Sequence, residues 1–131
     1  VGAMRAAGLE PREADGGFRI EGGHRATGEL LERDGGVTAL VAANNLMAIG
    51  VLRALAEHGR RVPEDVALVA LDDPFWAELV RPLLTTLGQP VRAMADAAMR
   101  LLLERIDGWA PSARHEVFEF ELRVRGSVTR E

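Results

Sequence analysis

The sequence predicts an α/β fold in which a mainly parallel sheet lies between layers of helices, as a three-layer sandwich. Two stretches carry this prediction: residues 66–73 read VALVALDD and residues 37–45 read VTALVAANN. Each begins as a continuous apolar run, which is typical of a strand buried on both faces of a parallel sheet. Helical patterns lie beside both runs, so the chain reads as successive strand–helix units.

Four helices are expected around these strands. Residues 1–7 form a short helix, and residues 20–33 form an amphipathic helix with alternating charges along its outer face. Residues 46–58 form a helix that is apolar on most of its sides. Such a helix is buried on more than one side, so we expect the sheet to cover one side and another subunit to cover the other. Residues 90–107 form a long fourth helix.

Two further strands and a short helix complete the expected elements. Residues 82–87, PLLTTL, read as a short strand. Residues 118–125 alternate strictly between apolar and charged side chains, which predicts a strand with one face in water. Pro74 suits the first position of a short helix, with Asp73 as its cap.

The composition excludes several classes of protein. The 131 residues are 47% hydrophobic, enough for one domain with a real core. The formal net charge is -4 and the basic residues are scattered, which argues against nucleic-acid binding by this chain. The absence of cysteine excludes disulfides and thiolate metal sites. No membrane span or signal peptide is recognisable, so we expect no membrane partner and a cytoplasmic location.

Polar side chains follow both central strands at their carboxyl ends. Asn44 and Asn45 follow one strand, and Asp72 and Asp73 follow the other. Because neighbouring parallel strands bring these ends to one edge of a sheet, the side chains are expected to converge. Carboxylates accept hydrogen bonds and amides both donate and accept, which suits a sugar or another polar small molecule. Since the same residues also cap helices, we favour capping for Asn45 and Asp73, and ligand contact for Asn44 and Asp72.

The aromatic residues after the second strand leave two interpretations open. Trp76 either stacks on the CH face of a sugar ring or fills the space under the loop as a hydrophobic plug. For Phe75 we favour the second interpretation, the plug. The histidines are far apart in the sequence, and the sequence contains no phosphate-binding loop and no serine-nucleophile motif. We therefore expect no enzyme activity, no cofactor and no metal.

Five segments together resemble the LacI/GalR family of bacterial transcription repressors, in the order in which that family carries them. They are residues 44–50 (NNLMAIG), 59–66 (GRRVPEDV), 71–73 (LDD), 82–90 (PLLTTLGQP) and 123–127 (RVRGS). The likeness implies the type I periplasmic binding protein-like fold, of which this chain would be the C-terminal lobe. It also places Phe18, after Gly16 and Gly17, in a ligand-contacting loop. Asn45 departs from the family's pattern, which has Asp at this position.

The same resemblance implies how the chain is divided. Residues 1–89 would form the C-terminal lobe of the effector-binding domain. Residues 90–121 would cross to an N-terminal lobe that lies upstream of Val1, and residues 122–131 would be the return strand and tail. The chain begins without an initiator Met, at what reads as the middle of a helix, so we expect a piece of a larger protein. In this family operator DNA is contacted only through a helix-turn-helix at the N-terminus.

Two functions follow from the resemblance. The first is the effector-binding and dimerisation portion of a LacI-type transcription regulator, with a sugar or sugar-like small molecule as effector. The alternative is a fragment of a periplasmic sugar-binding protein of an ABC transporter. The apolar helix favours the first, because we expect it to form a homodimer through residues 46–57 and the segment 80–87.

Overall fold

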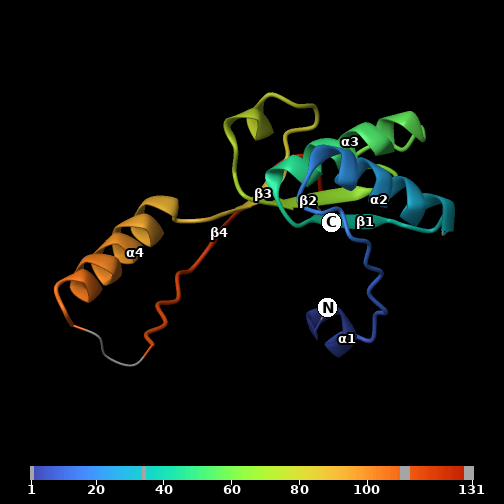
Figure 1. Cartoon of the computed structure of the whole chain (residues 1–131). Helices are drawn as coiled ribbons and strands as arrows, with labels where there is room; N and C mark the ends of the chain where they lie inside the picture. Colours follow the sequence, from blue (N-terminus) through green and yellow to red (C-terminus); the bar gives the residue numbers. More distant parts are fainter. Residues whose placement is uncertain (1, 34, 110–112, 129–131) are drawn as a thin grey trace.

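A computed structural model of the chain describes residues 2–33, 35–109 and 113–128, and contains one four-stranded sheet with helices around it (Figure 1). Residue 1 of the first expected helix and residues 129–131 of the expected tail lie outside the described residues. The described elements are, in chain order, α1 (Gly2–Ala6), α2 (Ile20–Arg33), β1 (Ala39–Ala42), α3 (Asn45–Glu57), β2 (Ala67–Leu71), the 3-10 helix η1 (Phe75–Glu78), β3 (Thr85–Gly88), α4 (Val91–Ile106) and β4 (Glu121–Arg123).

The sheet has the order β1-β2-β3-β4 and is mainly parallel. Strands β1 and β2 pair in parallel with Leu40 opposite Leu68, and β2 and β3 pair in parallel with Ala70 opposite Thr86. Only β4 runs antiparallel, against β3. The predicted α/β class and the adjacency of the two central strands are therefore confirmed. Their parallel pairing brings the carboxyl ends of β1, β2 and β3 to one edge of the sheet.

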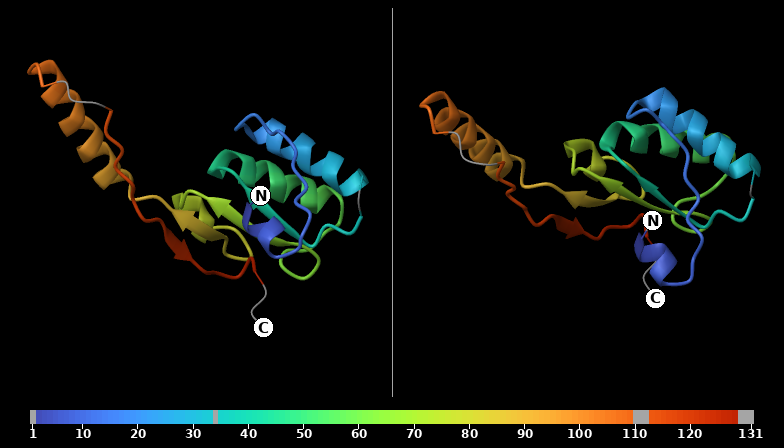
Figure 2. Two further views of the ribbon diagram at one scale, coloured as in Figure 1. Left: turned by 90° about the horizontal axis from the view of Figure 1, so that it is seen from below. Right: turned by 60° about the horizontal axis from the view of Figure 1, so that its bottom comes forward.

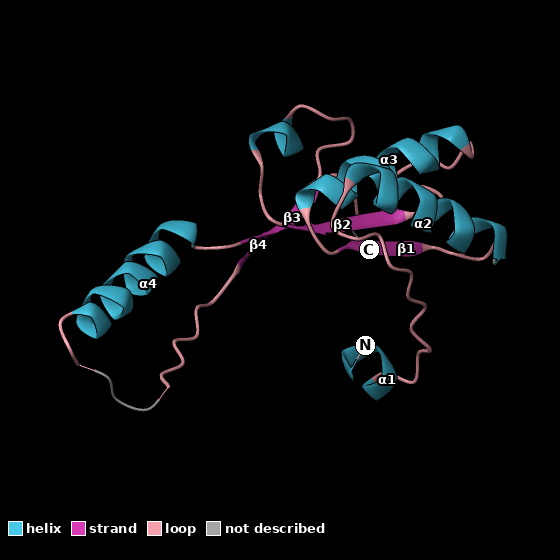
Figure 3. Cartoon of the chain, in the orientation of Figure 1, coloured by secondary structure: helices cyan, strands magenta, loops and turns pink. Residues whose placement is uncertain are grey.

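The hydrophobic core lies between α3 and one face of the sheet. Leu68 and Ala70 of β2 are fully buried there, as are Ala48 and Ala54 of α3, and Leu55 is almost fully buried. Helix α2 lies on the same side of the sheet and packs mainly against α3 (Figure 3). We expected another subunit to cover the outer side of α3, but α2 of the same chain covers part of it.

Backbone contact between α2 and α3 is made possible by two glycines. A Cβ atom on Gly50 would lie 2.1 Å from the carbonyl oxygen of Ile20, and one on Gly23 would lie 2.6 Å from the carbonyl oxygen of Met47. These separations leave no room for any side chain. The two helices therefore touch backbone to backbone, and this contact places the start of α2 beside the start of α3.

The opposite face of the sheet is more open than its apolar sequence predicts. Burial alternates along β2, and Val41 of β1 is 71% exposed. The prediction that both central strands are buried on both faces is wrong for the described residues, because α2 and α3 lie over the same face (Figure 2). Helix α1 lies on the other side of the sheet from them, but it buries none of its residues.

The last predicted strand is shorter and more exposed than expected. Of residues 118–125, β4 includes only Glu121–Arg123, and all three of its residues are exposed. The expected buried face is not formed, since Leu122 is 57% exposed. The segment after β4 is better anchored: the Ser127 hydroxyl donates to Leu68 O at 2.5 Å and accepts from Thr85 N at 2.8 Å. Ser127 thus joins the end of the chain to β2 and β3.

Helix α4 extends away from the sheet and forms an arm together with residues 113–120 (Figure 1). Ala97 is the one residue of α4 that is buried. Ion pairs between Arg100 and Glu116, and between Arg114 and Glu104, join the two sides of the arm. Its apolar side chains Val91, Leu102, Leu103 and Ile106 are each more than half exposed. Within the described residues, no helix is both long enough and apolar enough to cross a membrane.

The glycine contact gives a test of the fold. In Gly50→Ala the new methyl group must push α2 and α3 apart, so we expect the free energy of unfolding to fall by about 2 kcal/mol or more. Urea denaturation followed by circular dichroism measures this change. Gly28→Ala on α2 is the matched control, because its Cβ would meet only the tip of His58 at 3.7 Å. That variant should be neutral or up to about 1 kcal/mol more stable. Equal unfolding midpoints for Gly50→Ala and the unchanged chain would contradict the close contact.

Candidate functional site

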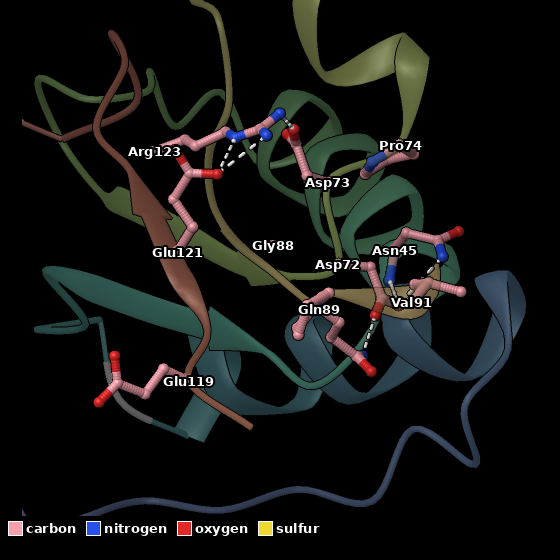
Figure 4. A pocket seen from close by; sticks show the side chains of 11 residues that line it. Asn45, Asp72, Asp73, Pro74, Gly88, Gln89, Val91, Glu119, Glu121 and Arg123 are labelled. Carbon is pink, nitrogen blue, oxygen red and sulfur yellow. Dashed lines mark hydrogen bonds and ion pairs between the residues drawn. The ribbon is translucent and has the colours of Figure 1, made fainter. Parts of the chain in front are cut away.

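Asp72 stands at the carboxyl end of β2 with its carboxylate between two amide side chains. Asn45 donates to Oδ2 through its side-chain nitrogen at 3.1 Å and its backbone N–H at 3.3 Å. Gln89, which follows β3, donates to Oδ1 at 2.5 Å. Figure 4 shows the Asn45 and Gln89 side chains meeting Asp72. Three strand ends therefore supply one cluster of hydrogen-bonding groups, as the parallel topology predicts.

The backbone of Asp72 is unusual. Its φ is 72°, in the left-handed region that few residues other than glycine adopt, although Asp and Asn adopt it more readily than others. Residues in this region cluster at functional sites, where the surrounding structure holds them in place. Here the two amide donors hold the Asp72 carboxylate at the edge of the sheet, where it is partly buried.

Asn44 caps α3, the role that we favoured for Asn45. Asn44 is the N-cap of α3, and its Oδ1 accepts a hydrogen bond from Met47 N at 2.8 Å. Asn45 is the first residue of the helix and reaches Asp72 instead. The prediction that Asn45 caps the helix is wrong, because α3 begins one residue earlier than expected. Whether Asn44 contacts a ligand stays a prediction.

Phe18 lies near the same edge because the Asn44 side chain also holds its backbone. Asn44 Nδ2 donates to the Phe18 carbonyl oxygen at 3.3 Å. Phe18 has a φ of 56°, and its side chain is 64% exposed. The turn before it is closed by Asp15, whose carboxylate accepts from Gly17 N at 2.8 Å. The start of α2 and the start of α3 are thus joined at the candidate site.

Asp73 has a structural role that the sequence did not predict. Its carboxylate accepts from Arg125 at 2.8 Å and from the Thr86 hydroxyl at 2.7 Å, and it also pairs with Arg123. The Arg125 guanidinium holds the pKa of Asp73 down, to about 2. The prediction that Asp73 caps the short helix is wrong, since the residue before η1 is Pro74 and no side chain caps it. Asp73 instead ties β2 to β3 and to the segment that contains β4.

The aromatic residues after β2 also differ from expectation. Trp76 is partly buried and packs against the core, so the plug interpretation describes its position. Phe75 is 84% exposed, so the plug interpretation that we favoured for Phe75 is wrong. The 3-10 geometry of η1 turns the two neighbouring rings in different directions. A ligand contact by Trp76 stays a prediction.

A pocket of about 570 Å³ opens beside Asp72. Its walls come from the carboxyl end of β2, the start of α3, the link between β3 and α4, and the strand that returns from the arm. The lining residues are Asn45, Asp72, Asp73, Pro74, Gly88, Gln89, Pro90, Val91, Glu119, Glu121 and Arg123. Of the four predicted site residues, Asp72 lines this pocket, whereas Asn44, Phe18 and Trp76 are not among its lining residues.

Sequence reasoning missed Gln89 and the contact between Asn45 and Asp72. The rule that identified Asp72 could have found Gln89, because this residue directly follows the third parallel strand. Within the ranges that the structure describes, no group of three or more His, Asp or Glu side chains could hold a metal ion. The Asp72 carboxylate and the amides of Asn45 and Gln89 can form hydrogen bonds to a polar molecule at this edge.

Comparison with known proteins places this chain in a family. Residues 2–128 match the family described as the periplasmic binding protein-like domain, and the chain belongs to that family. The HTH-type transcriptional regulator CelR of Thermobifida fusca is 42% identical over 128 residues, which are 95% of this chain and 38% of CelR. The chain thus spans somewhat more than a third of this curated relative. The resemblance to LacI-type regulators is confirmed.

Solved structures of LacI-type regulators also match this chain. A structure of a CelR–cellobiose complex is 41% identical, with a TM-score of 0.86, and the match covers 96% of this chain and 39% of that one. A LacI family regulator from Arthrobacter sp. FB24 in complex with lactose is 30% identical, with a TM-score of 0.81, over 98% of this chain and 49% of that one. These relatives are named as transcriptional regulators and not as enzymes, and their names give no support to a transporter's sugar-binding protein.

The low pKa of Asp73 predicts a pH dependence of stability. Because the pKa is about 2 in the folded chain and 3.8 is the ordinary value, ionisation of Asp73 stabilises the fold above about pH 4. This contribution, about 2 kcal/mol, is lost as the pH falls toward 2. We expect Asp73→Asn to be less stable than the unchanged chain at pH 6, with a difference that shrinks toward pH 2. Urea denaturation at a series of pH values measures this difference.

The control for this experiment is Asp96→Asn, which removes an exposed carboxylate from α4. Its stability difference from the unchanged chain should be small and nearly constant with pH. If Asp73→Asn gave the same flat profile as Asp96→Asn, the ion pairs of Asp73 with Arg123 and Arg125 would not contribute to stability.

Proposed function

We propose that this chain is the effector-binding and self-associating part of a LacI-type transcription regulator, and that its effector is a carbohydrate. The observation that carries the proposal is the pocket in which amides from two neighbouring strand ends hold the Asp72 carboxylate. The cellobiose and lactose complexes of the related regulators support a sugar as the ligand class. A regulator of this kind acts in the cytoplasm.

Asp72 is the central ligand contact in this proposal. A carboxylate offers about four acceptor positions, so it can accept from sugar hydroxyls as well as from Asn45 and Gln89. Asn44 retains one side-chain N–H and one lone pair after its contacts with Met47 and Phe18. The exposed Phe18 ring and Trp76 complete the proposed contacts, since an aromatic ring suits the CH face of a sugar.

The proposal divides the chain into three parts. Residues 1–89 form the lobe that carries Asp72, residues 90–121 form the arm and its links to the sheet, and residues 122–131 return to the lobe. We assign no DNA contact to any of them. The formal net charge is -4, and binding to operator DNA needs a concentrated positive surface.

Self-association would use residues 46–57 of α3 and the segment 80–87, which begins directly after Leu79. Leu46 is 43% exposed, Leu79 is 68% exposed, and Leu83 is 37% exposed. Leu52 lines a surface hollow together with Arg81 and Pro82, so α3 adjoins the 80–87 segment. We propose a second copy of the chain as the partner, because a two-fold pair buries such a surface against itself. The exposed leucines are the apolar part of this surface, and burying them is favourable.

The ligand role of Asp72 is tested by Asp72→Asn. Asparagine has nearly the same shape and tolerates a positive φ, so the fold should be retained. Replacing one acceptor oxygen by an NH₂ group should weaken binding of cellobiose by about tenfold or more. Calorimetric titration of a panel of cellobiose, lactose and ribose measures the effect. Asp65→Asn, at the opposite end of β2, is the control and should bind as the unchanged chain does. Unchanged affinity in Asp72→Asn would leave Asp72 a structural role only.

The proposed dimer is tested by light scattering. The chain should have about twice its 14.2 kDa mass in solution, and Leu79→Glu should reduce this to the mass of one chain, because a carboxylate cannot be buried unpaired. Val117→Glu is the control, since Val117 lies on the arm and is 93% exposed. A chain that stays monomeric at high concentration would contradict the proposal. Dissociation by Val117→Glu but not by Leu79→Glu would assign the contact to the arm.

A further inference from the structure

We infer that the pocket selects uncharged sugars and rejects sugars that carry a phosphate or a carboxylate. This inference rests on the proposed function, because it concerns the same site. The pocket contains four carboxylates, from Asp72, Asp73, Glu119 and Glu121, and Arg123 is the one cationic side chain among its described lining residues. An anionic ligand would therefore enter a region of like charge.

Arg123 is already engaged by carboxylates of the protein. Its Nε and Nη2 donate to Glu121 Oε2 at 3.1 and 2.9 Å, and its Nη1 pairs with Asp73. All three nitrogens of the guanidinium are thus in use. A phosphate binds best to arginine through two parallel N–H groups, so it would compete with Glu121 for the Nε and Nη2 donors of Arg123. Asp73 also pairs with Arg125, so a ligand cannot easily remove Asp73 from this network.

Some of the N–H groups at the helix starts beside the pocket are also already hydrogen-bonded within the protein. A helix N-terminus can bind phosphate through its free N–H groups. At α3 the first of these, Asn45 N–H, points to the Asp72 carboxylate at 3.3 Å, and Met47 N–H points to Asn44 Oδ1. At α4, Pro90 has no N–H, and Val91 N donates to Gln89 O at 2.9 Å. The protein therefore places its own anion, Asp72, where a phosphate would otherwise bind.

A neutral sugar meets none of these obstacles. Each hydroxyl can donate to the Asp72 carboxylate and accept from an amide such as Asn45 or Gln89. Because these hydrogen bonds involve no net charge on the ligand, the carboxylates of Glu119 and Glu121 do not repel it. The selectivity thus arises from the charges of the pocket. The hydrogen-bonding groups can bind neutral and anionic sugars alike and do not distinguish between them.

The test compares matched sugars with and without phosphate. Calorimetric titration of the full chain at low ionic strength would use ribose and ribose 5-phosphate, then cellobiose and its 6-phosphate. We expect each phosphate ester to bind at least about tenfold more weakly than the parent sugar. The ratio of the two affinities, parent sugar to phosphate ester, should fall as salt screens the charges. Glu121→Gln removes one carboxylate and leaves two donors of Arg123 without an anionic partner, so it should reduce the ratio of the two affinities by about fivefold.

Glu32→Gln is the matched control, because Glu32 is an exposed residue on α2 and does not line the pocket. The ratio of sugar affinity to phosphate-ester affinity in Glu32→Gln should equal that of the unchanged chain. Equal or tighter binding of the phosphate esters would overturn the inference while leaving sugar binding intact. A change in Glu32→Gln as large as that in Glu121→Gln would also overturn it, since the selectivity would then not arise in the pocket. If no sugar bound with or without phosphate, the proposed function itself would fail.

Discussion

The backbone contact between α2 and α3 is the constraint on which the rest of this structure depends. Gly23 and Gly50 let the two helices touch near their N-terminal ends, and α3 in turn covers the sheet. Asn44 then links the two helix starts, because it caps α3 and holds the carbonyl of Phe18. The site at the edge of the sheet is therefore positioned by packing one layer away from it. A site built in this way is held by helices rather than by loops alone.

Two neighbouring carboxylates at this edge have different surroundings and hence different roles. Asp73 is held by Arg123 and Arg125, so its charge is balanced within the protein and its pKa is low. Among the residues that the structure describes, the Asp72 carboxylate receives hydrogen bonds from amides, which a ligand's hydroxyl groups can supplement or replace. This contrast explains why one acid of the pair is suited to a ligand and the other to the fold. It also gives a physical reason for Arg125 in the RVRGS segment.

The sequence was sufficient for the order and type of most elements, and for the edge at which the site lies. Apolar runs and helical periodicity located β1, β2, α2 and α3, and parallel topology brought Asp72 to the same edge as Asn45. The individual roles depended on finer features. A shift of one residue in the start of α3 made Asn44 the capping residue in place of Asn45. The two arginine partners of Asp73 lie about 50 positions away, and no local pattern predicts them. One face of β1 is exposed because α2 and α3 both lie over the other face of the sheet. An apolar run in the sequence does not specify where the helices lie.

The arm is joined to the sheet at two points, after Gln89 and before Glu121, and residues at both points line the pocket. The width of the pocket is therefore linked to the angle of the arm. Helix α4 has 16 residues, so at 1.5 Å per residue it is about 24 Å long. A rotation of about 10° at its base would move the far end by roughly 4 Å, by the geometry of a rod of that length. A change in the angle of the arm at the pocket would therefore move the far end of α4 further than its base.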